Sequence, residues 1–149
     1  MITCIIIDDE RNAREFLEKL IHRKFPKKLI VLDTADSVKN GVEIIKKRRP
    51  DLVFLDIQMP EEYGLALFNH FDTVFFDVIL TTAHKEYAIE AIKKDAFDYL
   101  LKPINLIDLN DVIRKYEKKQ EKNERESRVR SVLENFNVDS KEFNKLAIP

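Results

Sequence analysis

The chain has 149 residues, of which 44% are hydrophobic and 36% charged, and its formal net charge is −1. This length is enough for one domain with a buried core, and the small net charge gives no basic field that would favour nucleic acid or a membrane surface as a partner. The single cysteine, Cys4, excludes an intrachain disulfide framework and is expected in the core, because it lies in an apolar run. No apolar run reaches transmembrane length and no signal-peptide pattern follows Met1, so we expect a cytoplasmic protein.

Short apolar runs and helical spacings alternate along the chain and predict strands and helices in turn. The predicted strands are 2–7, 29–32, 52–55, 74–80 and 97–101. Between and after them we predict five helices: one with the apolar residues Ala13, Phe16, Leu17, Leu20 and Ile21, one capped by Ser37 with Val38, Val42 and Ile45 inside, a short one around 65–68, one over 86–94, and a long one from Asn105. Because the strands are too apolar to have a solvent-facing side, this pattern predicts an α/β fold, a doubly wound five-stranded parallel sheet with helices on both faces.

The stretch from Arg114 to Arg130 is dense in charge, and its basic residues outnumber the acidic ones. We expect the last helix to run through it past a domain over 1–120, so that 121–149 form a charged helical extension and linker. Two interpretations of this extension stay open. It is either a solvated helical face or a coiled-coil-like, partner-binding segment.

Polar residues follow four of the predicted strands, and the carboxyl ends of parallel strands meet at one edge of a sheet. These residues are Asp8 and Asp9, Asp56, Thr81 and Thr82, and Lys102. Each alone has a structural explanation, since aspartate caps turns and helices, threonine is favoured in strands, and Lys-Pro is a usual way to leave one. Together, at four successive strand ends, they predict a functional site.

The chemistry that suits this set is specific. Three carboxylates close together repel one another and favour a hard divalent cation such as Mg²⁺ or Mn²⁺. A carboxylate can also act as a nucleophile on phosphorus and form an aspartyl phosphate. That transfer depends on neutralising the phosphoryl oxygens, to which the Lys102 ammonium and a threonine hydroxyl can contribute.

These motifs resemble the receiver domains of two-component response regulators across residues 1–120. The matching residues are Asp8-Asp9 after the first strand, Asp56 with Met59-Pro60 and Gly64, Thr82-Ala83 after the fourth strand, and Lys102-Pro103 after the fifth. The resemblance implies a flavodoxin-like sheet of order 2-1-3-4-5, in which strands one and three are neighbours. One departure is the pair Arg11-Asn12, where relatives often have apolar or proline residues.

By position, the resemblance implies that Asp56 accepts a phosphoryl group from a sensor histidine kinase in a Mg²⁺-dependent reaction. Asp9 and Asp56 would bind the metal ion directly, together with the backbone carbonyl of Gln58, and Asp8 would act mostly through water. Lys102 would pair with the phosphoryl group.

The same resemblance implies a switch. Thr82 would bond the phosphoryl group and shift on activation, and Tyr99 would be the aromatic residue that turns inward when it does. An ordinary half-buried strand tyrosine is the other interpretation of Tyr99. Gln58 and His84 stand at the positions that tune the lifetime of the phosphoryl group.

Residues 81–88 and 97–104 are similar to receivers of the LytTR class (LytR/AlgR type), which carry a C-terminal DNA-binding domain. Asn144–Pro149 is similar to the start of that second domain. The resemblance implies a bacterial transcription regulator whose output domain is absent from this chain. It also implies a homodimer through the fourth helix, fifth strand and fifth helix when the receiver is phosphorylated.

Other functions remain to be weighed. A stand-alone receiver would act by protein contact or as a phosphorelay intermediate. A hydrolase with an aspartyl-phosphate intermediate usually has a second aspartate where Gln58 stands, and a nucleotide- or flavin-binding module would need a glycine-rich phosphate loop, whereas the chain has two glycines, Gly41 and Gly64. We therefore expect a signalling domain and not an enzyme, with at most self-phosphorylation from small donors and autodephosphorylation.

Overall fold

The computed structural model describes residues 1–60, 62–87 and 96–136. In chain order the elements are β1 (Ile2–Ile7), α1 (Arg11–Lys24), β2 (Leu29–Ala35), α2 (Val38–Arg48), β3 (Leu52–Asp56), the 3-10 helix η1 (Gly64–His70), β4 (Asp77–Thr82), β5 (Asp98–Leu101) and α4 (Leu106–Asn135). The helix predicted over 86–94 falls largely outside the described residues. The short helix predicted around 65–68 is present, with 3-10 geometry.

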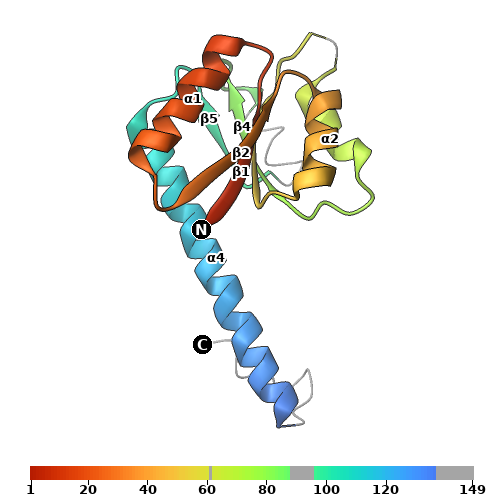
Figure 1. Ribbon diagram of the computed structural model, residues 1–149, viewed down its shortest axis with the longest axis vertical. Helices are drawn as coiled ribbons and strands as arrows, with labels where there is room; N and C mark the ends of the chain where they lie inside the picture. Colours follow the sequence, from red (N-terminus) through yellow and green to blue (C-terminus); the bar gives the residue numbers. More distant parts are fainter. Residues whose placement is uncertain (61, 88–95, 137–149) are drawn as a thin grey trace. The chain divides into compact units, whose positions relative to one another are not determined.

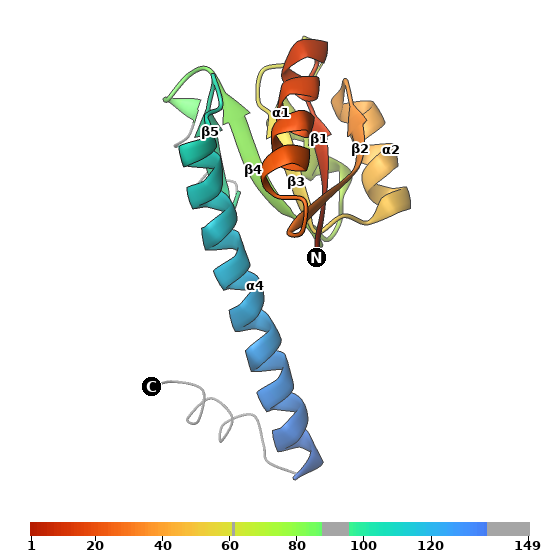
Figure 2. The same cartoon turned by 60° about the vertical axis from the view of Figure 1, so that its left-hand side comes forward.

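The five strands form one sheet in which every pair is parallel, in the order β2-β1-β3-β4-β5 (Figure 1). The predicted doubly wound α/β sheet is therefore confirmed, and so is the strand order that the family resemblance implied. Helices α1 and α2 lie on opposite sides of the sheet (Figures 1 and 2). The parallel order brings the carboxyl ends of β1, β3, β4 and β5 to the same edge.

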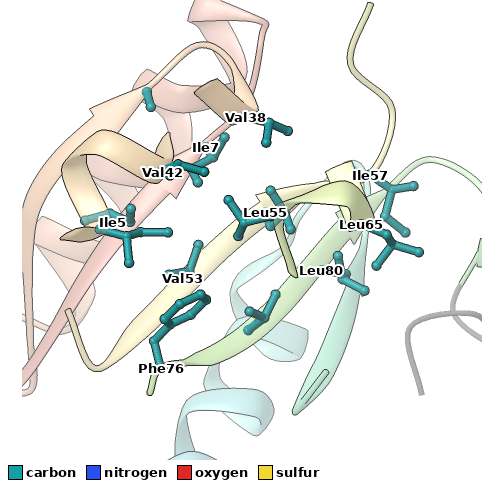
Figure 3. Close-up of a cluster of buried hydrophobic side chains, with 14 residues drawn as sticks. Ile5, Ile7, Val38, Val42, Val53, Leu55, Ile57, Leu65, Phe76 and Leu80 are labelled. Carbon is teal, nitrogen blue, oxygen red and sulfur yellow. The ribbon is translucent and has the colours of Figure 1, made fainter. Parts of the chain in front are cut away.

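The core on the α2 side is formed by alternate residues of the central strands, because successive side chains of a strand point to opposite faces (Figure 3). Its members from β1, β3, β4 and α2 include Ile5, Ile7, Val53, Leu55, Val78, Leu80, Val38, Val42 and Ile45. The intervening residues Cys4, Ile6 and Phe54 are also buried. Both faces are covered, which explains the uninterrupted apolar runs of these strands. Burial raises the pKa of the Cys4 thiol to about 12, as expected of a core residue.

Helix α2 begins at the Ser37 cap that its sequence predicts. The Ser37 side chain caps it by accepting the Asn40 N–H at 3.1 Å. The helix ends at Arg48, and the residue that follows it, Arg49, has φ 46° although it is not glycine; its N–H donates to the Ile45 carbonyl at 2.9 Å. Gly41 lets the helix approach β1 closely, because a Cβ at this position would collide with the side chain of Ile7.

The predicted strand 74–80 is wrong at its start. β4 begins at Asp77, whose N–H donates to the Asp51 carbonyl at 2.9 Å. The preceding aromatic residues instead pack edge-to-face with one another, in the pairs Phe71–Phe75, Phe71–Phe76 and Phe75–Phe76. The Arg49 guanidinium lies 3.9 Å from the centre of the Phe75 ring. Aromatic clustering beside a cation therefore takes the place of strand pairing here.

In α1, Phe16 is 53% exposed although it shares the helical spacing of the buried Leu17 and Ile21. The expectation that every strand is buried on both faces is wrong for β2. β2 runs on to Ala35 beyond the predicted end and is not buried on both faces, since Ile30 is 45% exposed. As an edge strand, β2 has a neighbouring strand on one side only, which leaves more of its side chains in solvent.

The chain divides into two compact units, residues 1–109 and 110–149. Within the second unit, the described part continues α4, and the Tyr116 hydroxyl accepts a hydrogen bond from Nε2 of Gln120 at 2.6 Å. Residues 121–136 are exposed except for half-buried Leu133. The prediction of a helix through the charge-dense stretch is confirmed. Among the described residues, no helix combines the length and apolarity needed to cross a membrane.

Candidate functional site

Three carboxylates converge where β1 and β3 end. Asp8 and Asp9 directly follow β1, and Asp56 is the last residue of β3. Because Ile7 and Leu55 are paired across these strands, the side chains that come next meet at the sheet edge. One carboxylate oxygen of each of the three aspartates lies within 4.8 Å of the others. Asp8 and Asp56 are each only 4% exposed, so this cluster of negative charge is largely withdrawn from water.

The Lys102 ammonium reaches the same cluster from the end of β5, the edge strand two positions away from β3. Its Nζ lies 2.8 Å from Oδ2 of Asp8 and 3.6 Å from Oδ2 of Asp56. Lys102 directly follows β5, and its N–H donates to the Thr82 carbonyl at 2.7 Å. Since β5 is separated from β3 by β4, and strands lie about 4.8 Å apart, only a long side chain can reach these carboxylates. The peptide bond from Lys102 to Pro103 is cis.

The electrostatics of the cluster shift two pKa values. Burial raises the pKa of Asp56 to about 7, and the negative charge of Asp8 adds to this shift, while Lys102 and the backbone N–H of Gln58 oppose it. For Lys102, burial alone would lower the pKa, but the hydrogen bond to Asp8 and the charge of Asp56 outweigh it and leave the pKa raised. Lys102 is therefore a cation, and Asp56 takes up or loses its proton near neutral pH.

Asp8 is the most constrained of the three aspartates. Besides the Lys102 pair on Oδ2, its Oδ1 accepts the Glu10 N–H at 2.9 Å. Its backbone carbonyl accepts from Nη1 of Arg14 at 2.8 Å. Both carboxylate oxygens of Asp8 thus have partners within the protein, and Asp9 is half-buried.

The loop after β3 passes closely over the end of the strand that carries Asp56. The Gly64 N–H donates to the Ile57 carbonyl at 2.7 Å. A Cβ on Gly64 would collide with the backbone carbonyl of Asp56 and would lie 2.8 Å from Cα of Ile57. Close backbone approach therefore requires glycine here. The Gln58 N–H donates to Oδ1 of Asp56 at 3.4 Å, a long hydrogen bond.

The other residues singled out from the sequence lie on the loop after β4 and on β5. Thr82 is buried, and its hydroxyl is bonded to the backbone of His84, accepting the N–H at 3.0 Å and donating to the carbonyl at 3.4 Å. The hydroxyl is thus engaged by the His84 backbone. Tyr99 is half-buried beside Leu80 of β4 and packs against the core on the α2 side.

Sequence reasoning missed two residues that contact this site and one contact at the other edge of the sheet. Tyr87 accepts a hydrogen bond from Nε2 of Gln58 at 3.3 Å. Arg14 holds the backbone of Asp8. At the opposite edge of the sheet, Oδ2 of Asp51 accepts from both the N–H and the hydroxyl of Thr3, at 2.9 and 3.0 Å. No spacing in the sequence indicates these contacts, because each joins segments whose proximity depends on the fold.

Comparison with known proteins agrees with this geometry. Residues 4–114 match the profile of the family described as the response regulator receiver domain. The sensory transduction protein LytT of Bacillus anthracis is 32% identical over 152 residues, covering 100% of this chain and 59% of LytT. The transcriptional regulatory protein BtsR of Escherichia coli (strain K12) is 39% identical over 106 residues, covering 70% of this chain and 44% of BtsR.

Among solved structures, the REC domain of AraT, a response regulator from Geobacillus stearothermophilus, superposes with a TM-score of 0.72 at 30% identity. The match covers 83% of this chain and 98% of that domain. By contrast, the chain spans less than two thirds of the length of either LytT or BtsR. The profile, the relatives and the parallel sheet with its acidic edge all lead to one assignment: the chain belongs to the response regulator receiver domain family.

Proposed function

We propose that this chain is a phosphorylation switch in which Asp56 accepts a phosphoryl group from a sensor histidine kinase. Receiver domains are signalling domains that interact with histidine kinases and bind Mg²⁺ through acidic residues. The observation that carries the proposal is the buried Asp56 carboxylate at the end of β3, beside two further carboxylates and 3.6 Å from the Lys102 ammonium.

In the transfer, a carboxylate oxygen of Asp56 forms a bond to phosphorus as the P–N bond of the kinase phosphohistidine breaks and its electron pair returns to the imidazole. Asp56 attacks as the anion, and a pKa of about 7 means that it is partly protonated at neutral pH. Positive charge near its oxygens therefore favours the reactive form. Lys102 provides part of that charge.

The acidic cluster fits a divalent metal ion. Three carboxylates and one ammonium leave an excess of negative charge in a buried place, and oxygen atoms are the ligands that Mg²⁺ and Mn²⁺ prefer. Asp9, Asp56 and the Gln58 carbonyl would hold the ion directly. Asp8, whose carboxylate oxygens already have partners in Lys102 and Glu10, would act mostly through water. When bound, Mg²⁺ neutralises oxygens of the incoming phosphoryl group.

The remaining residues complete the switch. Thr82 would leave the His84 backbone and donate its hydroxyl to the phosphoryl group, and Lys102 would pair with it. Tyr99 would then turn inward on β5, next to the space that Thr82 vacates. Gln58 lies two residues after Asp56, and His84 lies two residues after Thr82. These two side chains would tune how long the phosphoryl group survives.

For the output, we propose control of transcription by a DNA-binding domain of LytTR type outside this chain, with 1–120 as the receiver and 121–149 leading toward that domain. Phosphorylated receivers would form homodimers in the cytoplasm. The contact would be made by the helix predicted over 86–94, by β5 and by the last helix, α4. The greater length of LytT and BtsR supports this proposal over a stand-alone receiver or phosphorelay intermediate. Gel filtration of a chain extended through the second domain, with and without phosphorylation, tests the dimer.

The phosphorylation itself is tested by intact-mass spectrometry after incubation with acetyl phosphate. We expect one phosphoryl adduct on the wild type in the presence of Mg²⁺ and none when EDTA is added. Asp56→Asn, which keeps the shape of the side chain, is expected to give no adduct. An adduct that persists in Asp56→Asn would place the acceptor elsewhere, and a wild type that never gains an adduct would refute the proposal.

A further inference from the structure

The loops after β3 and β4 are joined through Tyr87, a side chain that has no part in the proposed transfer. Nε2 of Gln58 donates to the Tyr87 hydroxyl at 3.3 Å. The Tyr87 ring stands edge-on to the rings of His84 and Tyr63, with centroids 5.9 and 6.2 Å apart. These separations lie within the range of about 4.5–7 Å typical of aromatic pairs. Tyr87, which lies on the segment after Thr82, therefore contacts His84 of that segment and also Gln58 and Tyr63 of the segment after Asp56.

The His84 backbone holds Thr82 in its present position. The Thr82 hydroxyl accepts the His84 N–H and donates to the His84 carbonyl. A hydroxyl has one proton to donate, so donation to the His84 carbonyl and donation to a phosphoryl group on Asp56 exclude each other. The same His84 carbonyl also accepts the Tyr87 N–H at 3.2 Å, so Tyr87 contacts His84 through both its backbone and its ring.

We propose that Tyr87 is a positioning residue of the phospho-acceptor site, whose hydroxyl holds Gln58 and whose ring holds His84 in the arrangement that keeps Thr82 away from Asp56. This inference rests on the proposed phosphorylation of Asp56. The hydrogen bond between Gln58 and Tyr87 lies close to the acceptor, because the backbone N–H of Gln58 donates to Oδ1 of Asp56. A contact made in only one of two arrangements shifts their equilibrium by its own free energy.

Tyr87→Phe removes the hydroxyl and keeps the ring. The 3.3 Å separation is long for an N–H···O hydrogen bond, so the effect lies at the weaker end of what neutral hydrogen bonds give. We expect the rate of Mg²⁺-dependent phosphoryl uptake from acetyl phosphate to rise about two- to fivefold. We also expect the amide proton of His84 to exchange with solvent faster, by a similar factor, in the unphosphorylated protein. This second readout does not depend on phosphoryl chemistry.

A matched control is Tyr116→Phe. The Tyr116 hydroxyl also accepts a hydrogen bond from a glutamine amide, Nε2 of Gln120, at 2.6 Å. The substitution therefore makes the same chemical change in the second unit of the chain. Phosphoryl uptake and His84 amide exchange are expected to stay at their wild-type values.

A double-mutant cycle with Gln58→Ala tests whether the hydrogen bond carries the effect. If it does, Tyr87→Phe changes uptake in the wild-type background and adds nothing when Gln58 is already alanine. Two results would overturn the role of Tyr87 and leave phosphorylation of Asp56 intact. One is that phosphoryl uptake and His84 amide exchange are unchanged in Tyr87→Phe, and the other is that the effects of Tyr87→Phe and Gln58→Ala on uptake simply add. A wild type without any adduct would instead refute the proposed function itself.

Discussion

Lys102 and Asp8, 94 positions apart in the chain, form an ion pair of 2.8 Å at the carboxyl edge of the sheet. The Asp8 side chain is 6% exposed and the Lys102 side chain 21%, so the pair lies mostly out of water. The same ammonium is 3.6 Å from Asp56. One lysine thus offsets the repulsion between two buried carboxylates, and the stability of the fold is linked to the chemistry of the site.

Removing this charge destabilises the protein. Lys102→Met keeps the length of the side chain but leaves Asp8 and Asp56 without their cation, and we expect the free energy of unfolding at pH 8 to fall by about 2 to 4 kcal/mol. Urea denaturation measures the change. Lys102→Arg retains a positive charge and is the control, expected to lose less. Equal losses in both variants would show that packing, and not charge, is the contribution of Lys102.

Asp56 itself makes stability depend on pH. Its pKa rises from the ordinary 3.8 to about 7 in the folded protein, mainly through burial and then through the charge of Asp8. Between these values the folded state holds a proton that the unfolded state has lost, so stability falls as pH rises from about 4 to 7. Above pH 7, Asp56→Asn should therefore be more stable than the wild type by about 2 to 4 kcal/mol.

This advantage of Asp56→Asn should shrink as the pH falls and approach zero below about pH 3, where the carboxyl is neutral in both the folded and the unfolded state. Denaturation curves of the two proteins at several pH values, recorded in EDTA to exclude metal ions, measure it. A difference that does not vary with pH would contradict the raised pKa of Asp56.

Metal binding to the acidic cluster should stabilise the fold. A ligand that binds only the folded state stabilises it by about 1.4 kcal/mol at ten times its dissociation constant. We therefore expect Mg²⁺ to raise the Tm of the wild type and EDTA to reverse the increase. Asp9→Asn should weaken the response, whereas Asp72→Asn, a change at an exposed residue between η1 and β4, should not. A response to Mg²⁺ that is equal in all three proteins would show binding elsewhere.

The two glycines should differ in their tolerance of alanine. In Gly64→Ala the new Cβ meets backbone atoms of Asp56 and Ile57, which cannot move without distorting the end of β3. We expect a loss of about 2 to 3 kcal/mol in the free energy of unfolding, together with slower phosphoryl uptake. In Gly41→Ala the Cβ meets the end of the Ile7 side chain and no backbone atom, and alanine gains about 1 kcal/mol in helix propensity. Gly41→Ala should thus lie within about 1 kcal/mol of the wild type, and a larger loss there than at Gly64 would contradict this account.

Much of the fold could be predicted from local patterns. Runs of β-branched residues in β1 and β3 and the helical spacing of Val38, Val42 and Ile45 depend only on neighbours in the chain, so the order of strands and helices followed from them. The same patterns failed at residues 74–76, because an aromatic cluster and a strand have the same apolar composition. The order of the strands in the sheet came from the family resemblance and not from the alternation itself.

The sequence by itself determined which polar groups follow the strands, and hence that Asp8, Asp9, Asp56 and Lys102 belong to the candidate site. The tertiary structure alone decided how they are joined: Lys102 closest to Asp8, Thr82 on the backbone of His84, and Gln58 on Tyr87. The reason is physical. The register of parallel strands brings together groups that are far apart in sequence, and the reach and orientation of each side chain then select its partner, neither of which is encoded in local spacing.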